Sequence, residues 1–111
     1  MSILLVNDQS IALDQDGYLL HLSDWSPAVA EAIAVQAELH LSDAHWEVLH
    51  LLRGFYAEYQ LSPASRPLIK YAALHLGADK GNSLHLNRLL NGTPAKLAAK
   101  LAGLPKPTNC L

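Results

Sequence analysis

The sequence has one cysteine, one phenylalanine and two tryptophans in 111 residues. A single cysteine excludes an intramolecular disulfide and any zinc site built from several thiolates. No apolar run approaches the roughly 20 residues that a membrane-spanning helix needs. The N-terminus lacks the basic start and apolar block of a secretory signal, so we expect a cytoplasmic protein that makes no membrane contact.

Basic residues are absent from the first half of the chain. Residues 1–52 contain eight acids and no lysine or arginine, whereas residues 53–111 contain eight lysines and arginines and two acids. The net charge of −2 therefore conceals an acidic half and a basic half. Half of the residues are apolar and 16% are charged, which is typical of a folded chain, and the length fits one domain.

Six histidines raise the question of a metal site. His40, His45 and His50 recur at intervals of five, and on one helix that spacing places them on different faces. There is no HExxH motif, and the glycines form no phosphate-binding loop motif. We therefore expect no metal and no cofactor, with His45 at a helix cap and core edge.

The first 23 residues predict short strands. Residues 3–7 and 10–14 are apolar runs, and Asp16-Gly17 is typical of a type I′ hairpin turn leading into a third run at 18–22. The N-terminal region therefore predicts a small β-hairpin unit of two or three strands.

Residues 24–103 predict a helical core. Ser26-Pro27 and Thr93-Pro94 both combine an N-cap residue with proline at the first helical position, and Gly77, Gly92 and Gly103 follow helical stretches. The expected helices start near residues 27, 43, 65, 82 and 94. The helix from Ser42 to Gln60 has the broadest apolar face, so we expect it at the centre of the core. Trp25 is expected to pack onto the first helix.

Residues 104–111 predict a C-terminal arm. Pro105 and Pro107 exclude a helix and favour extended backbone. We expect this arm to be flexible and to bury little, so that removing residues 106–111 would barely change stability. The fold class is thus α+β: a mainly helical domain with an N-terminal β-hairpin, helix-turn-helix-like packing and a flexible arm.

Cys110 is the penultimate residue of that arm. A thiol on a projecting arm can reach into another protein's active site, and the thiolate is its reactive form. No histidine adjoins it and no second cysteine could resolve a disulfide. A carrier that is loaded by one partner and unloaded by another fits these residues, and a tail without function fits them equally well.

A different class remains open on the residues alone. Arg66, Lys70 and Arg88 fall on or near predicted helices of the basic half, where they could form a surface for RNA or an acidic partner, or only a solvated face. A helix-turn-helix nucleic-acid binder would place more basic and amide side chains on one helix. A pI near 6.3 argues against autonomous nucleic-acid binding.

From Leu13 to Leu111 the chain resembles the TusE/DsrC family of sulfur-carrier proteins. The matching segments are Leu13–Leu19, Asp24-Trp25, Leu41–Tyr59, Ser62–Lys70, Gly81–Ser83, Thr93–Lys96 and the tail AGLPKPTNCL. The tail is the most specific of these, because it is a long ordered pattern that ends in a penultimate cysteine.

The resemblance implies that Cys110 carries a persulfide. DsrC-type members, which serve dissimilatory sulfite reductase, have a second cysteine eleven residues earlier, where this chain has Ala99. A single cysteine resembles the TusE type, which implies a sulfurtransferase that relays sulfur for thiolation of the wobble uridine of tRNA. The implied partners are a TusBCD-like donor complex and an MnmA-like thiouridylase. Whether the protein touches tRNA itself stays open, as does service to a sulfite reductase.

Overall fold

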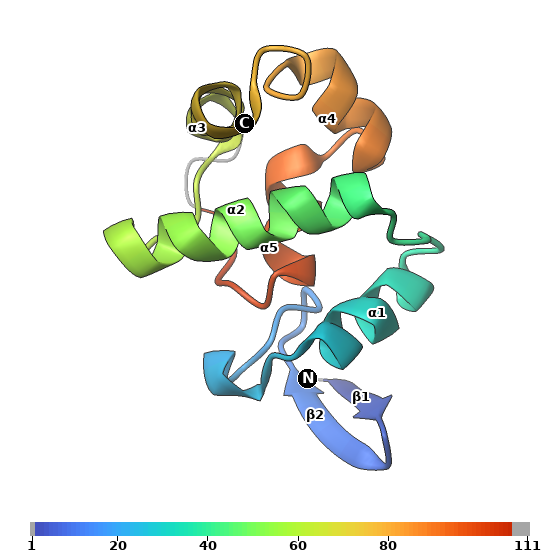
Figure 1. Ribbon diagram of the computed structural model, residues 1–111. Helices are drawn as coiled ribbons and strands as arrows, with labels where there is room; N and C mark the ends of the chain where they lie inside the picture. The colour runs from blue at the N-terminus through green and yellow to red at the C-terminus, as the bar shows by residue number, and fades with distance from the viewer. Residues whose placement is uncertain (1, 108–111) are drawn as a thin grey trace.

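A computed structural model of the protein describes residues 2–107. Cys110, the predicted sulfur carrier, lies outside the described residues. The elements in chain order are β1 (Ser2–Val6), β2 (Gln9–Leu13), a 3₁₀ turn (Leu22–Asp24), α1 (Pro27–Gln36), α2 (Asp43–Tyr59), α3 (Ser65–Leu76), α4 (Ser83–Leu89) and α5 (Pro94–Leu101). The predicted α+β class and the five predicted helices are confirmed. The hairpin and α1 lie at one end of the molecule, and α3 and α4 lie at the other (Figure 1).

The β-hairpin turns at Asn7-Asp8, before Asp16-Gly17, the pair with the strongest hairpin-turn motif in the sequence. β1 and β2 pair antiparallel from Ser2↔Leu13 to Val6↔Gln9. Asn7 and Asp8 connect them with φ values of 49° and 67°, the left-handed pair that a type I′ turn requires. Asparagine and aspartate tolerate this conformation better than other non-glycine residues.

A third strand over residues 18–22 does not form. The Asp14 carboxylate accepts hydrogen bonds from the backbone N–H groups of Asp16 (2.8 Å) and Tyr18 (3.0 Å), closing a side-chain turn. Only an isolated bridge, Leu13↔Leu19, follows before the chain enters the 3₁₀ turn. Asp16-Gly17 therefore belongs to a turn that places the Tyr18 side chain, and of the two or three predicted strands two form.

Of the two predicted cap-and-proline pairs, the Ser26 side chain forms its capping bond at the start of α1, whereas the Thr93 side chain forms none, although Pro94 begins α5 as expected. Ser26 accepts a hydrogen bond from Val29 N–H, and Pro27 is the first residue of α1. At the start of α2, His45 Nδ1 accepts from the N–H of Ser42 (3.0 Å), and its Nε2 lies 2.7 Å from the Leu89 carbonyl. Because Nδ1 accepts a bond, Nε2 carries the proton and donates. The buried imidazole thus joins α2 to the end of α4, at the cap and core edge where it was expected.

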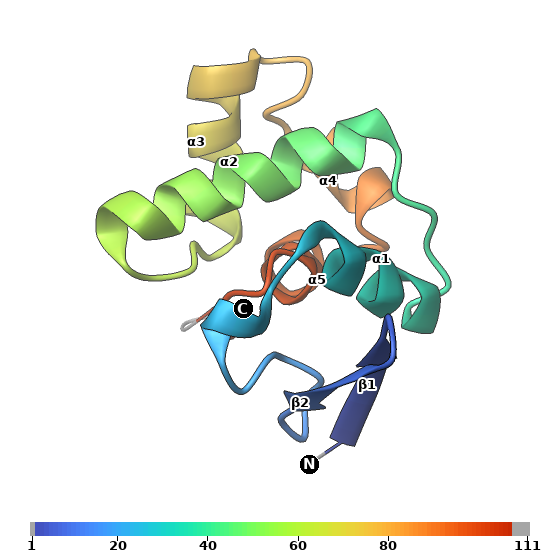
Figure 2. The same ribbon diagram turned by 60° about the horizontal axis from the view of Figure 1, so that its bottom comes forward.

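The centre of the core is α5 rather than α2. Figure 2 shows α5 nearly end-on, with α2 on one side and α1 and the hairpin on the other. α5 packs against α1, α2, α3 and α4. Its alanines make this possible, because small side chains let neighbouring helices approach closely on several sides: the buried ones are Ala95, Ala98 and Ala99, with Ala102 just beyond the last turn. The broad apolar face of α2 covers one side of this helix.

Candidate functional site

The C-terminal arm leaves directly from this central helix. The N–H of Gly103 bonds to the Lys100 carbonyl (3.2 Å), and the N–H of Leu104 bonds to the Ala99 carbonyl (2.9 Å). Gly103 has a φ of 72°. This pair of bonds around a left-handed glycine is a Schellman motif, which ends a helix and sets the direction of the following chain. We call residues 102–107 the arm root.

Two side chains from distant segments hold the carbonyls at the end of α5. The Trp25 indole Nε1–H donates to the Leu101 carbonyl (2.9 Å), and the Arg53 guanidinium donates to the Ala102 carbonyl (2.6 Å). The guanidinium also lies 3.9 Å from the Trp25 ring centroid, in a cation–π contact. Partial burial lowers the pKa of Arg53, because desolvation disfavours the charged form. Trp25 was expected to pack onto the first helix. Its indole N–H instead bonds to a carbonyl at the end of α5.

Glycine at position 103 fits this arrangement for a second reason. A Cβ atom there would overlap the Trp25 ring. The Trp25 side chain therefore lies close against the backbone at the arm root, and only glycine accepts both the close contact and the positive φ.

The arm root is packed on the body, which corrects the expectation of an arm that buries little. Leu104 is 3% exposed, and Pro107 is buried. The Pro105 carbonyl accepts a hydrogen bond from the buried Ser62 hydroxyl at 2.6 Å. Lys106 Nζ lies 3.5 Å from an Asp16 carboxylate oxygen. Proline rings cover apolar surface at little entropic cost, so a short extended segment can be held in place when partners from other elements meet it.

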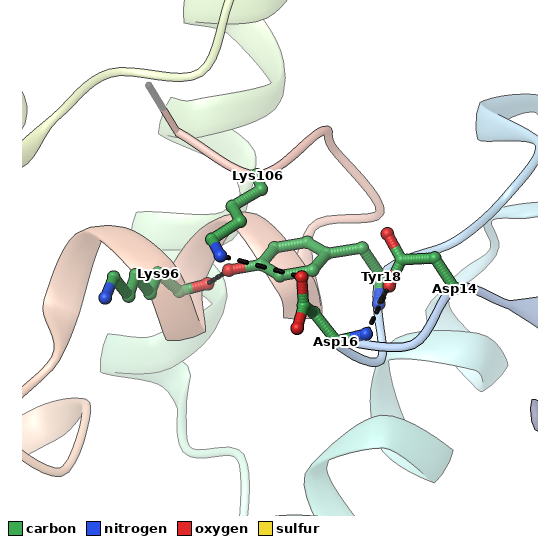
Figure 3. Close-up of polar contacts among 5 residues, drawn as sticks. All are labelled: Asp14, Asp16, Tyr18, Lys96 and Lys106. Atoms are coloured by element: carbon green, nitrogen blue, oxygen red, sulfur yellow. Dashed lines mark hydrogen bonds and ion pairs between the residues drawn. The ribbon is translucent and has the colours of Figure 1, made fainter. Parts of the chain in front are cut away.

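A hollow of about 230 Å³ adjoins the arm root. Its lining consists of Asp16, Tyr18, Thr93, Lys96, Leu97, Lys100 and Lys106. Figure 3 shows its polar contacts: the Tyr18 hydroxyl donates to the Lys96 carbonyl (3.2 Å), and Lys106 reaches across to Asp16. Three segments that carry the family resemblance, around residues 13–19, 93–96 and 102–107, therefore meet at one place. Spacing along the sequence gave no sign of this convergence.

The other residues singled out from sequence are spread over the molecule. Ala99, the position of the second cysteine in DsrC-type proteins, is fully buried in α5. Arg66 and Lys70 on α3 and Arg88 on α4 are exposed. Within residues 2–107, no three histidine, cysteine, aspartate or glutamate side chains come together as a metal site would need.

Arg53 and Ser62, whose side chains bond to the arm root, are the residues of this site that the sequence reasoning missed. Arg53 was counted only as a basic residue, yet it lies four residues after Leu49 and three before Tyr56, on the inward face of α2. The position of a charged residue among the apolar residues of one helix face was the sequence signal that could have identified Arg53. In the sequence Ser62 stood out only as the start of the matching segment Ser62–Lys70, and nothing local predicts its bond to Pro105.

Comparison with known proteins assigns the chain to a family. The family described as DsrC like protein matches residues 5–111. The chain belongs to the DsrC-like family. Within it, this chain is 52% identical over 109 residues to the sulfurtransferase TusE homolog of Haemophilus influenzae, covering 98% of this chain and all of the relative. It is 47% identical over all 111 residues to sulfurtransferase TusE of Photorhabdus laumondii, which it also covers completely.

Solved structures of the same family share the fold. The structure of Allochromatium vinosum DsrC superposes with a TM-score of 0.90 at 44% identity, covering 99% of this chain and 98% of that one. The oxidized γ-subunit of the dissimilatory sulfite reductase of Archaeoglobus fulgidus, also DsrC, gives a TM-score of 0.85 at 33% identity, covering 99% and 100%. In the part of this chain that the structure describes, no helix has the length and apolar character of a membrane span.

Proposed function

We propose that this protein is a sulfur-relay protein of the TusE type, in which Cys110 carries sulfur as a persulfide. The observation that carries the proposal is the attachment of this sole, penultimate cysteine to an arm root that is anchored as far as Pro107. Family membership and the sulfurtransferase relatives support the relay role. The cysteine count supports the TusE type, because the position of the second DsrC cysteine is the buried Ala99.

The chemistry needs no cofactor and no external oxidant. The Cys110 thiolate attacks the terminal sulfur of a donor persulfide, the donor S–S bond breaks, and the donor cysteine leaves as a thiolate. Cys110 then holds a new S–S bond. An acceptor thiolate attacks the terminal sulfur of that persulfide in turn and releases the Cys110 thiolate. Each step exchanges one S–S bond for another, so electrons balance.

The anchored arm root explains how one thiol can serve two partners. Cys110 is three residues beyond Pro107, a span of at most about 11 Å for an extended chain. Ser62, Lys106 and the Trp25–Arg53 pair fix the point from which that span starts. A fixed starting point limits the volume that the thiol can search, which raises its effective concentration in a partner's site.

The partners that we propose are a TusBCD-like donor and an MnmA-like acceptor, with 2-thiouridine at the wobble position of tRNA as the product. The basic half of the chain carries the arm, so acidic surfaces on these partners would be attracted towards the thiol. High salt would then slow transfer by screening this attraction.

The test is to incubate the protein with a persulfide-loaded TusBCD-type complex and to weigh the intact protein. We expect the wild type to gain the mass of one sulfur atom, removable by a reductant, and Cys110→Ser to gain none. If the folded wild type binds the donor and gains no sulfur, the carrier role is wrong. If it is loaded and delivers sulfur to a sulfite reductase system but not to a thiouridylase, the DsrC-like role replaces the TusE role.

A further inference from the structure

The two edges of the β1–β2 sheet differ. Within residues 2–107, β1 pairs with β2 alone. The outer edge of β2 is in use, because the N–H of Leu20 donates to the Ala12 carbonyl there (3.1 Å). The chain that follows β2 runs on that side of the hairpin, and β1 lies on the outside (Figure 1 and Figure 2). The sheet therefore has one covered edge and one open edge, the outer edge of β1.

The backbone groups of Ile3 and Leu5 point out of the open edge. In an antiparallel pair, residues that exchange backbone bonds alternate with residues whose N–H and C=O point away from the partner strand. The Ala12 carbonyl points away from β1, because it accepts the bond from Leu20. Ile3 faces Ala12 in the register, so its N–H and C=O also point outward, and Leu5 repeats this two residues later. No hydrogen bond to these groups is formed by residues 2–107.

The open edge has none of the features that usually prevent strand addition. Native proteins protect an edge with a lysine, a proline, a β-bulge or a covering segment. The sequence of β1, SILLV, contains no charge and no proline, and its ladder with β2 is regular from end to end. The side chains of Ile3 and Leu5 are 53% and 72% exposed on the outward face. Such an edge can accept a further strand through its backbone groups and these two apolar side chains.

We infer that β1 pairs with β1 of a second copy of this chain, so that two hairpins form one four-stranded antiparallel sheet. The register is centred on Leu4. Ile3 then faces Leu5 of the second copy, and Leu5 faces Ile3 of the second copy. Each of these pairs joins two residues whose backbone groups point outward, so each exchanges two backbone bonds. Their side chains lie on the same outer face and contact each other. The contact is symmetric, because the same two residues supply both sides.

Charge favours a second copy as the occupant. The open edge is uncharged, so the best match is another uncharged strand, and β1 itself is one. Asp8 in the hairpin turn is the first charged residue after β1. In an antiparallel pair centred on Leu4, the two copies of Asp8 lie at opposite ends of the paired strands. No like charges therefore face each other, which would oppose pairing. A strand with a charged residue would place it against Ile3 or Leu5.

The contact is small and involves no residue of the arm root. Two strands of five residues bury less than the about 1,200 Å² of a stable interface. We therefore expect a monomer in dilute solution and a dimer that forms as the concentration rises. The arm root begins at the end of α5, away from the hairpin, so both copies keep it available for other partners.

The first test is sedimentation equilibrium of the full chain over about a hundredfold range of concentration. A reductant keeps Cys110 from joining two chains through a disulfide. We expect the average mass to rise from that of a monomer towards twice that value. Leu5→Lys should weaken association by about tenfold or more, because the symmetric contact loses two apolar pairs. The matched control is Leu74→Lys, at an exposed leucine on α3, and it should leave association unchanged.

Amide hydrogen exchange of the wild type locates the contact without any variant. The amides of Ile3 and Leu5 should exchange more slowly as the concentration rises. The Ser10 amide is the internal control, because Ser10 faces Leu5 in the hairpin and its N–H points out of the opposite edge. A monomer at every concentration, a dimer that tolerates Leu5→Lys, or protection elsewhere would overturn the inference. Protection of Ile3 and Leu5 only after a TusBCD-type complex is added would also overturn it and assign the edge to a strand of that partner. None of these measurements uses the Cys110 thiol, so their failure leaves the sulfur-relay proposal standing.

Discussion

The two ends of the chain are both short and extended, but they are held in different ways. The β1–β2 hairpin is held by its own ladder and by one face turned to the core, while Ile3 and Leu5 on the other face are 53% and 72% exposed. The arm root makes no strand, yet side chains from distant segments hold it and Leu104 is 3% exposed. Local pattern therefore positions the hairpin, whereas long-range contacts position the arm root.

The comparison is tested most severely by Gly103→Ala. The new Cβ atom would overlap Trp25 and force a non-glycine residue into a φ of 72°, and together these effects should cost roughly 2–5 kcal/mol of unfolding free energy. Gly92→Ala is the matched control, because Gly92 has a φ of 81° and nothing within 4 Å of the added atom. It should cost about 1 kcal/mol. Equal losses in urea unfolding would show that the contact with Trp25 is unimportant.

Arg53→Met should have the next largest effect. The variant keeps the length of the side chain but loses the bond to the buried Ala102 carbonyl and the contact with Trp25, at a cost of about 1.5–3 kcal/mol. Arg66→Met on the exposed face of α3 should stay within about 0.5 kcal/mol of the wild type. Thermal and urea unfolding of both variants measure the difference. An unchanged unfolding free energy in Arg53→Met would mean that the end of α5 does not depend on the hydrogen bond and the cation–π contact of Arg53.

Ser62→Ala tests the hold on the arm itself. Loss of the bond to the Pro105 carbonyl should cost about 1 kcal/mol and should slow sulfur transfer by more than the stability change explains, because the starting point of the arm is loosened. Ser10→Ala, at an exposed position of β2, should change neither quantity. Transfer rates measured well below the melting temperature separate the two effects. If Ser62→Ala were destabilised but transferred sulfur at the wild-type rate, the bond would be merely structural.

Leu5→Thr should have the smallest effect. Leu5 points away from the core on a paired strand, and threonine suits a strand as well, so the change in unfolding free energy should stay below about 0.5 kcal/mol. A loss larger than that of Ser62→Ala would reverse the comparison, because it would show that the outer face of the hairpin is packed in solution.

The elements that sequence predicts well are those whose signals are local. Ser26-Pro27 and Gly77 mark helix boundaries because caps and left-handed glycines act within one turn. The hairpin turn was assigned to Asp16-Gly17 because that pair has the stronger motif, but the Asp14 side chain closes that segment instead. The same side-chain turn explains why two strands form, and not three.

The arm root could not be predicted, because its partners come from far along the chain. Ser62 and Pro105 are 43 residues apart, and Trp25 and Leu101 are 76 apart. Pro105 and Pro107 correctly excluded a helix over residues 104–107, but the absence of a helix does not show which residues cover the segment. The central place of α5 was missed for a related reason, since its alanines look weakly apolar in sequence and matter only when several helices meet.

The central claim, that Cys110 carries the sulfur, is tested most directly by following labelled sulfur. The protein is loaded with ³⁵S from a persulfide donor, freed of excess donor, and mixed with a thiouridylase and its tRNA. The account predicts that label leaves Cys110 and appears in the wobble nucleoside, and that Cys110→Ser delivers none. Equal labelling of the tRNA by wild type and Cys110→Ser would contradict it.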